Sequence, residues 1–202
     1  MLRKIVGPTT CCLLLSCGVL AAPRKEHSPP VYYIPSTVGD KLVFEDDFGD
    51  QREWVAEVTE ARQNGAAKFV TVRVLQGDFT SEPWRHEVSD KGIYRVAVGD
   101  AVLESPECIL RLPFRKGETW ETTRIDQGET VTHKFASADE EEVEVPAGKF
   151  RCLRVEAECV FKGVTWKRTL WYAPRVGMVK AVDKDNHSVL TTVLKSFAAG
   201  GR

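Results

Sequence analysis

The stretch EVEVPAGKFRCLRVEAECVF, residues 142–161, carries the clearest structural signal in the chain. Apolar and polar residues alternate on both sides of Pro146-Ala147-Gly148, which is the period of a strand with one face toward a core. Pro146 has no N–H for a strand ladder and Gly148 accepts a backbone reversal, so these residues predict a turn. They include no nucleophile, general base or metal ligand. We therefore interpret residues 142–161 as a β-hairpin and not as a catalytic loop.

The same period of two continues through most of the chain after residue 40. Val70, Val72 and Val74 form one apolar row. Each row should give its strand one face for a core and one for water. Turn residues such as Asn64-Gly65 and Lys162-Gly163 separate the strands. The pattern predicts an all-β protein with little helix, built from an antiparallel sheet of about 9–12 strands.

One segment is ambiguous. Trp54, Val58 and Ala61 also fit helical spacing, with Asn64-Gly65 as a C-terminal stop, but we prefer a strand because a β-rich run follows. Two later rows are read as strands. Tyr94, Val96 and Val98 alternate with Arg95 and Ala97. Val164, Trp166, Leu170 and Tyr172 form another apolar row, which Arg168 interrupts.

Residues 1–21 have the features of a secretory signal peptide: a basic start, an apolar centre and a small-residue exit. We predict cleavage after Ala21. A second exit exists, because residues 14–17 resemble a bacterial lipobox in which Cys17 would be lipidated. The protein is therefore expected to be exported, periplasmic or extracellular, or alternatively anchored to a membrane through a lipid on Cys17.

The mature chain is expected to begin with a tether and continue as one domain. Residues 22–31 are charged and proline-rich, which predicts a flexible tether, and residues 32–198 form the antiparallel β domain. The formal net charge is −1, with acidic and basic residues interspersed. No basic stripe favours nucleic acid and no basic amphipathic helix favours a membrane surface. Contact with a membrane is expected only through lipidated Cys17.

The chain also repeats itself with a period close to 80 residues. Three matches stand in order: residues 34–42 with 112–120, residues 68–74 with 149–155, and Trp84 with Trp166, at offsets of 78, 81 and 82. We predict two similar β-meanders of about 80 residues each. They would form one domain, because two such meanders can bury their apolar faces together.

No pattern in the sequence predicts a catalytic or metal site. The four histidines (His27, His86, His133 and His187) fall in different segments, and no cysteine pair has zinc spacing. Asp183-x-Asp185-x-His187 resembles the start of a calcium loop, but it lacks the required glycine and glutamate. Hydrolase and nucleotide-binding signatures are missing. We therefore expect no catalytic residue, no metal ligand and no cofactor.

Three cysteines remain after cleavage at Ala21: Cys108, Cys152 and Cys159. Cys152 and Cys159 lie seven residues apart on one predicted strand, so their side chains should point to opposite faces and not pair. Cys108 could reach one of them. Buried free thiols are the preferred interpretation, since small thiols are common in cores.

Trp171 is the one aromatic residue that the strand pattern places apart from the core. It alternates out of phase with Trp166 and Leu170, so it should face away from the side that they bury. An outward tryptophan is typical of a surface that contacts a ligand or a partner. We therefore name Trp171 as the candidate residue for a cavity rim or a docking surface.

Four strings together resemble those of the exported TapB-like proteins and related bacterial domains of unknown function: YYIPSTVGDKLVFE, LPFRKGETWE, EVEVPAGKFRCLRVE and WYAPRVGMVKAV. The likeness covers roughly residues 32–197. Arg175 departs from it, at a position where such proteins often have glycine. The resemblance implies a single, strongly curved antiparallel sheet similar to the half-barrel of the LolA and LolB lipoprotein carriers. Those carriers hold acyl chains on the concave face.

These observations favour a non-enzymatic binding or carrier module of the cell envelope for an apolar or amphipathic ligand. Its expected partner is a lipid or another hydrophobic ligand. The alternative is an envelope protein–protein interaction module without a small-molecule ligand, and a second alternative is an enzyme without a recognisable signature. Fold alone does not decide between them.

Overall fold

We analysed a computed structural model of the 202-residue chain, which describes residues 31–47, 52–126 and 128–201. The predicted signal peptide, its cleavage after Ala21, the lipidation of Cys17 and nearly all of the tether lie outside these residues. Those predictions stay untested by the structure. The described residues contain strands and turns and no helix, as the alternating pattern predicted. Consequently none of them belongs to a helix long and apolar enough to cross a membrane.

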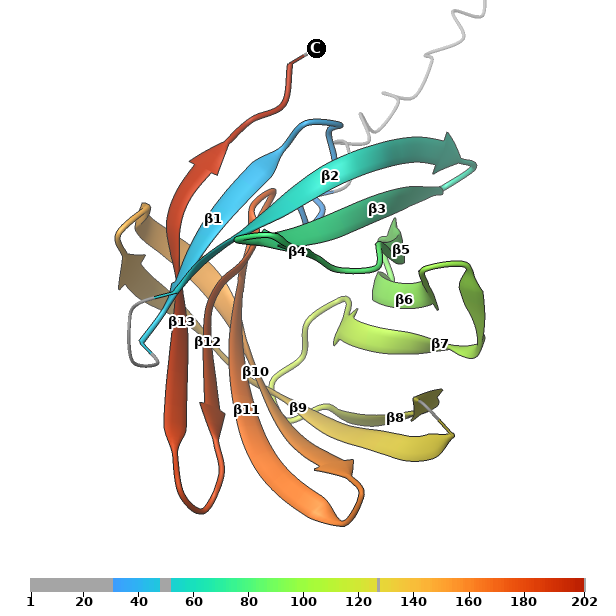
Figure 1. The fold of residues 1–202 in the computed structure, drawn as a ribbon, viewed down its shortest axis with the longest axis vertical. Coiled ribbons are helices and arrows are strands. Elements are labelled where there is room, and N and C mark those ends of the chain that lie inside the picture. The colour runs from blue at the N-terminus through green and yellow to red at the C-terminus, as the bar shows by residue number, and fades with distance from the viewer. Residues whose placement is uncertain (1–30, 48–51, 127, 202) are drawn as a thin grey trace, which may run out of the picture.

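The described residues form thirteen strands (Figure 1). Their bounds are β1 Lys41–Asp46, β2 Glu53–Asn64, β3 Ala67–Gln76, β4 Phe79–Thr80, β5 Trp84–Ser89, β6 Gly92–Val98, β7 Ala101–Arg111, β8 Thr119–Asp126, β9 Glu129–Val145, β10 Gly148–Phe161, β11 Val164–Ala173, β12 Gly177–Lys184 and β13 Val189–Ala198. The number exceeds the expected range slightly, because the two-residue β4 pairs only with β3. Residues 53–64 are the strand that we preferred over a helix.

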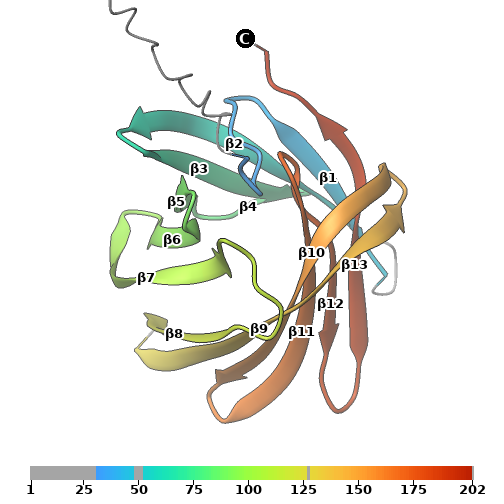
Figure 2. The ribbon, with the colours of Figure 1, turned by 180° about the vertical axis from the view of Figure 1, so that it is seen from behind.

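All thirteen strands belong to one antiparallel sheet, in the order β7-β6-β5-β3-β2-β1-β13-β12-β11-β10-β9-β8, with β4 beside β3. Two meanders therefore run in opposite directions from the β1–β13 pair, one holding β1–β7 and the other β8–β13. The sheet curls until its edge strands β7 and β8 come together (Figures 1 and 2). There the indole N–H of Trp120 donates to the carbonyl of Cys108 at 2.9 Å. The result is a nearly closed barrel, more closed than the predicted half-barrel.

The two meanders use the same backbone contacts at their first strands, which confirms the predicted repeat. Gly39 N–H donates to the carbonyl of Val58 at 2.9 Å, and Gly117 N–H donates to the carbonyl of Ser137 at 2.8 Å. A bulge follows each contact, after Val58 in the β2–β3 pair and after Ser137 in the β9–β10 pair. Both glycines have positive φ, 87° and 80° respectively. The repeated Pro-x-x-x-Gly string thus sets the same entry into each meander.

The segment Pro146-Ala147-Gly148 connects two strands of a hairpin as a turn, as predicted. β9 ends at Val145 and β10 begins at Gly148, so only Pro146 and Ala147 lie between the two strands. Gly148 adopts φ 129°, a backbone conformation that residues with a side chain rarely take. This pair of strands carries the longest ladder in the sheet, and the alternation in its sequence is correspondingly clear.

Residues 32–35 cover one end of the barrel. The carbonyl of Tyr32 accepts a hydrogen bond of 2.6 Å from the N–H of Arg175, whose positive φ of 66° is a conformation that glycine adopts more easily. A Cβ on Gly177 would lie 3.0 Å from Cδ of Pro35, so a larger residue would require Pro35 to move, and the φ of 94° at residue 177 also favours glycine. The main core includes side chains that are almost completely inaccessible: Leu110, Leu194, Val58, Val70, Val88, Val155 and Val179.

Candidate functional site

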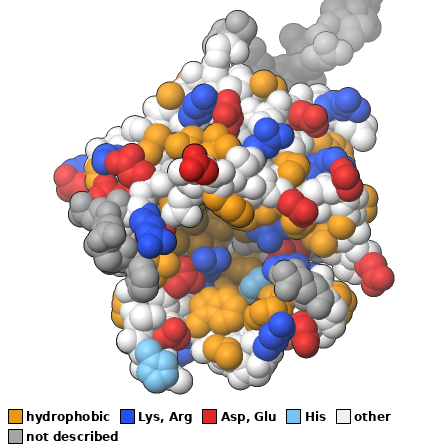
Figure 3. Space-filling view, in the orientation of Figure 1, with side chains coloured by type: hydrophobic (Ala, Val, Ile, Leu, Met, Phe, Trp, Pro, Cys, Tyr) orange, Lys and Arg blue, Asp and Glu red, His pale blue; other side chains and the backbone are white. Residues whose placement is uncertain are grey.

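The barrel encloses a cavity of about 520 Å³, lined by residues from both meanders. In the space-filling view the surface is hollowed in the middle of the face shown, with apolar side chains inside and basic and histidine side chains among them (Figure 3). Residues 33–35 contribute to its lining, as do the β11–β12 turn residues Val176 and Gly177. The volume lies within the range of about 300–1,000 Å³ that is usual for small-molecule sites.

Aromatic side chains from several strands form a large part of the apolar lining. Phe44 stacks on Trp54 with ring centroids 4.2 Å apart. Trp84 begins β5, Phe161 ends β10 and Trp166 lies near the start of β11, and all three are half-buried. Further apolar residues complete the lining: Leu42, Ile93, Ile109, Phe135, Leu170 and Met178. Most of the cavity wall is therefore suited to a hydrocarbon chain or a ring.

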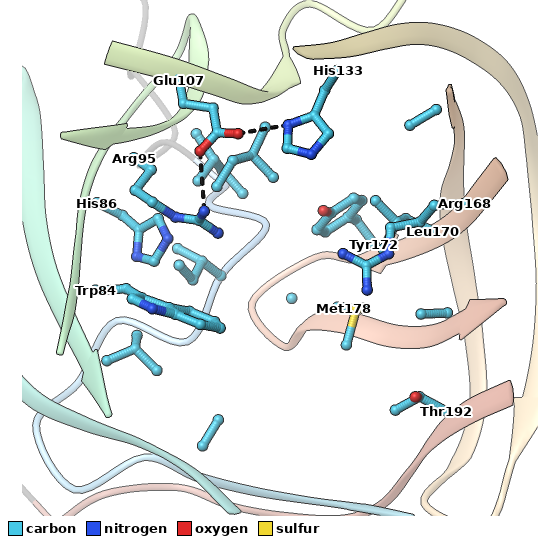
Figure 4. Close-up of a pocket in the computed structure, with 18 of the residues that line it drawn as sticks. Trp84, His86, Arg95, Glu107, His133, Arg168, Leu170, Tyr172, Met178 and Thr192 are labelled. Atoms are coloured by element: carbon cyan, nitrogen blue, oxygen red, sulfur yellow. Dashed lines mark hydrogen bonds and ion pairs between the residues drawn. The ribbon is translucent and has the colours of Figure 1, made fainter. Parts of the chain in front are cut away.

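A polar cluster interrupts this apolar lining on one wall. Its centre is Glu107 on β7, whose side chain is only 4% exposed. Its carboxylate accepts hydrogen bonds from Arg95 at 3.0 Å and from His133 at 2.7 Å (Figure 4). Burial alone would raise the pKa of Glu107, but the hydrogen bond from His133 and the charges of Arg95 and Arg124 bring it below the ordinary value. The carboxylate is therefore ionised at neutral pH.

Arg95 and His86 lie beside each other on the same wall, each with an atom that lacks a hydrogen-bond partner. The guanidinium of Arg95 lies over the Trp84 ring, 4.9 Å from its centroid. Nε of Arg95 and Nδ1 of His86 are both buried without a partner in the described residues. Burial, aided by the nearby Arg95 charge, lowers the pKa of His86 to about 3, so the ring is neutral at pH 7. Such unpaired buried polar atoms are uncommon in folded proteins.

The opposite wall contributes Arg168 and Tyr172 from β11. Two nitrogens of Arg168 donate to the two carboxylate oxygens of Asp183 at 2.7 and 2.9 Å. Burial raises the pKa of Tyr172 to about 12, so its hydroxyl keeps its proton at neutral pH. The Arg168 guanidinium points from this wall toward the space that Arg95 faces from the other (Figure 4). The cavity thus combines apolar surface with a few charged and polar groups.

The predicted apolar row of β6 was wrong. We placed Tyr94, Val96 and Val98 toward the core, whereas Ile93 and Arg95 line the cavity and Ala97 is 1% exposed. The interior at this level is polar, so the inward face of β6 carries a charge and the outward face carries apolar residues. The prediction that Arg168 interrupts the inward row of β11 was also wrong. Arg168 faces the cavity together with Trp166, Leu170 and Tyr172.

The residues that the sequence analysis weighed as metal ligands have structural roles. Among the described residues no group of three or more histidine, cysteine, aspartate or glutamate side chains could hold a metal ion. Asp183 binds Arg168, whereas Asp185 accepts hydrogen bonds from the N–H groups of His187 and Ser188 at 2.7 and 2.6 Å. The two aspartates thus serve an ion pair and a turn.

The three cysteines that the structure describes, Cys108, Cys152 and Cys159, are free and buried, as preferred from the sequence. Burial raises the pKa of Cys152 and of Cys159 to about 11, so both stay protonated at neutral pH. Cys159 lines the cavity and Cys152 does not. A protonated thiol is a poor nucleophile, and their structural role is packing.

Trp171 does not line the cavity and is half-buried. Its indole N–H donates to Glu141, and the ammonium of Lys180 lies 5.1 Å from the centroid of its ring. Trp166 and Leu170 do line the cavity, so the tryptophan side chains lie on opposite faces of β11, as the alternation predicted. Whether Trp171 contacts a ligand or a partner stays a prediction.

The residues that sequence reasoning missed are Arg95, Glu107, His133 and Arg168. Glu107 and His133 are 26 residues apart and meet only because the sheet curls β7 toward β9. One signal could have indicated that Arg168, and His86 in the first meander, point inward. His86 and Arg168 each stand two residues after a repeated tryptophan.

Comparisons with known proteins agree with this fold. A DUF3108-like family model matches residues 119–194, which fall in the second meander. The chain is similar to a protein from Bacteroides fragilis assigned as exported, with a YmcC-like fold, at 16% identity and a TM-score of 0.60, covering 84% of this chain and 100% of that one. It is also similar to a protein from Parabacteroides distasonis assigned as a lipoprotein, at 16% identity and a TM-score of 0.62, covering 83% and 99%. No curated protein matches the sequence. The chain thus shares the curved all-β fold of these proteins, while the finer likeness to TapB, LolA and LolB stays a prediction.

Proposed function

We propose that this protein is an exported, non-enzymatic binding or carrier module that holds an apolar or amphipathic ligand inside its barrel. The observation that carries the proposal is the cavity of about 520 Å³. Tightly packed interiors contain few voids larger than a water molecule, so a cavity of this size in a small barrel needs a reason. Binding a ligand of matching shape is the usual reason.

The chemistry of the lining supports the same function. Large apolar side chains surround most of the space, and the ionisable groups lie on two facing walls, around Glu107 and Arg95 on one and at Arg168 and Tyr172 on the other. Apolar surface supplies affinity, at roughly 25 cal/mol per Å² removed from water, and a few fixed polar groups orient the ligand. A ligand made of a hydrocarbon chain with a polar end would match both the apolar and the polar parts of the cavity wall.

Export is the second part of the proposal. Residues 1–21 read as a signal peptide, and similar folds occur in a protein assigned as exported and in one assigned as a lipoprotein. N-terminal sequencing of the mature protein tests it. Cleavage after Ala21 is the expected result, and a blocked, lipidated Cys17 would make the protein a membrane-anchored lipoprotein.

Native mass spectrometry of protein purified from its own source tests ligand binding directly. We expect a co-purified lipid or other hydrophobic molecule that is released by denaturation. An empty barrel isolated with a stable protein partner would favour the alternative, an interaction module.

A matched pair of tryptophan variants tests whether the barrel interior is the binding site. The fluorescence of the neutral dye N-phenylnaphthylamine should rise when it enters the cavity. Trp166→Ala removes part of the cavity wall and should weaken dye binding several-fold, whereas Trp171→Ala, on the other face of β11, should leave it unchanged. Equal dye affinity in both variants and the native protein would place binding elsewhere.

A further inference from the structure

The ionisable groups in the cavity converge on one region from opposite walls. Arg95 reaches it from β6 and Arg168 from β11, and the hydroxyl of Tyr172 is directed into the space between them (Figure 4). The two arginines also interact electrostatically, since the charge of Arg168 contributes to lowering the pKa of Arg95. Two guanidinium groups of like charge that face one space repel each other, and an anion between them would lessen that repulsion.

Two buried atoms on this wall have no hydrogen-bond partner in the part of the chain that the structure describes. Nε of Arg95 carries an N–H without a partner, and Nδ1 of His86 has none either. His86 is 5% exposed, so bulk water does not readily reach its ring. A neutral imidazole with its proton on Nδ1 can donate a hydrogen bond. Both side chains therefore bring polar groups with unused hydrogen-bonding capacity to the cavity wall.

The carboxylates near this region are already engaged. Glu107 accepts hydrogen bonds from Arg95 and His133, and Asp183 accepts two from Arg168. A cationic ligand would have to compete with these internal pairs and would face two arginines. An anion would instead add charge-assisted hydrogen bonds, and guanidinium groups bind carboxylate and phosphate oxygens in a fork-like geometry.

We propose that the ligand is an anionic amphiphile, whose carboxylate or phosphate head binds between Arg95, Arg168 and the Tyr172 hydroxyl while its hydrocarbon chain lies against the apolar lining. This inference rests on the proposed function, because it specifies the ligand of the same cavity. His86 lies beside Arg95 on the same wall. Trp84, stacked on Arg95, holds the guanidinium in place from the apolar side.

A set of single-chain competitors that differ only in the head group tests the proposal on the native protein. Hexadecanoate, hexadecyl phosphate, hexadecanol and hexadecylamine are each titrated against bound N-phenylnaphthylamine. We expect both anions to displace the dye at concentrations at least about tenfold below that of hexadecanol, and hexadecylamine to be the weakest. Equal displacement by all four overturns the anionic-head proposal but leaves the proposed function standing, since hydrophobic binding persists. No binding of dye or competitor overturns both.

Inorganic phosphate and acetate, titrated by calorimetry, separate a lipid head group from a free anion. Little or no heat from either is the expected result, because the hydrocarbon chain provides much of the affinity. Binding of inorganic phosphate as tight as that of hexadecyl phosphate would overturn the amphiphile and indicate a free anion as the ligand.

Three substitutions locate the head group. Arg95→Gln and Arg168→Gln should each reduce the preference for hexadecanoate over hexadecanol to within about threefold, with hexadecanol itself unaffected. Arg85→Gln is the matched control, because Arg85 is adjacent to His86 on β5 but exposed and outside the cavity lining. Circular dichroism checks the fold, and if Arg95→Gln fails to fold, the more exposed Arg168→Gln decides. An unchanged preference in folded Arg168→Gln would overturn the assignment.

Discussion

The two meanders share a backbone plan but place different charged pairs inside the barrel. In the first meander His86 on β5 lies opposite Arg95 on β6, and in the second Arg168 on β11 lies opposite Asp183 on β12. His86 and Arg168 occupy corresponding positions, two residues after the repeated tryptophan. The same place in the repeat therefore holds an imidazole–guanidinium pair in one half and a guanidinium–carboxylate pair in the other.

Under the proposed function, this difference separates the shared scaffold from the groups that we propose to select the ligand. The second pair is complete in itself, because both oxygens of Asp183 are bonded to Arg168. The first pair has no carboxylate of its own, and Arg95 turns to Glu107 on the next strand. The family match over residues 119–194 covers the self-contained half. Two cavity-lining side chains with a buried atom that lacks a partner among the described residues, His86 and Arg95, lie in the other half, and further such atoms, on Thr122 and Ser137, lie in the second half away from the cavity lining.

Removing the carboxylate of each half should show the largest contrast in stability. Glu107→Gln leaves Arg95 and His133 facing each other in a buried site. We expect it to lower the free energy of unfolding by an amount near the lower end of about 3–5 kcal/mol, since Arg95 keeps some contact with the cavity. Asp183→Asn should cost about 1 kcal/mol or less, because the side chain of Arg168 is 45% exposed.

Urea unfolding of both variants under identical conditions measures the difference. Comparable costs for the two substitutions would mean that the halves are energetically alike. The contrast between a dependent and a self-contained pair would then be incorrect.

The second prediction concerns pH and distinguishes His86 from the arginine at its repeat position. Burial lowers the pKa of His86 to about 3 in the folded protein, against about 6.5 in the unfolded chain. Between these values the unfolded chain binds more protons, so stability falls as pH falls and is fully present above about pH 6.5. This group alone should contribute a slope of up to about 1.4 kcal/mol per pH unit.

Urea midpoints measured between about pH 7.5 and pH 4.5 test this slope. The carboxylates titrate too, so the comparison is between variants. His86→Gln should have a shallower dependence than the native protein, whereas His187→Gln, in an exposed turn, should follow the native curve. An equally steep curve for His86→Gln would show that the ring is not held neutral by burial.

Local patterns were enough to predict most of the fold. Alternation and turn residues indicated the strands, and the hairpin at Pro146-Ala147 and the strand over residues 53–64 followed from them. The repeat could be recognised in the sequence because tight turns and close backbone contacts restrict the residue types that fit. Gly39 and Gly117 occupy positions with positive φ, which few other residues adopt easily.

The polar interior could not be predicted in the same way. Alternation separates two faces of a strand but does not indicate which face is inward when the barrel encloses polar groups, and β6 shows this with Arg95. The contact between Glu107 and His133 depends on the closure of the sheet near β7 and β8, which no local pattern encodes. The alternation placed Trp171 on the correct face of β11, but its hydrogen bond to Glu141 could be found only in the structure.

The smallest predicted effect tests whether both meanders depend on the same glycine turn. Gly39→Ala and Gly117→Ala should each lower the free energy of unfolding by about 1–2 kcal/mol, because a Cβ at positive φ meets the backbone of its own residue. Space alone would distinguish them: a Cβ on Gly39 would lie 3.4 Å from Cα of Gly200, and one on Gly117 meets nothing within 4 Å. Gly117→Asn is the control for bulk, since asparagine is larger than alanine but adopts positive φ more readily, and should cost less than alanine. If asparagine costs more than alanine at residue 117, bulk and not backbone conformation sets the requirement, and the shared turn does not explain the repeat. A markedly larger cost at residue 39 than at residue 117 would instead show that contact with the C-terminal segment adds a constraint to the first meander that the second lacks.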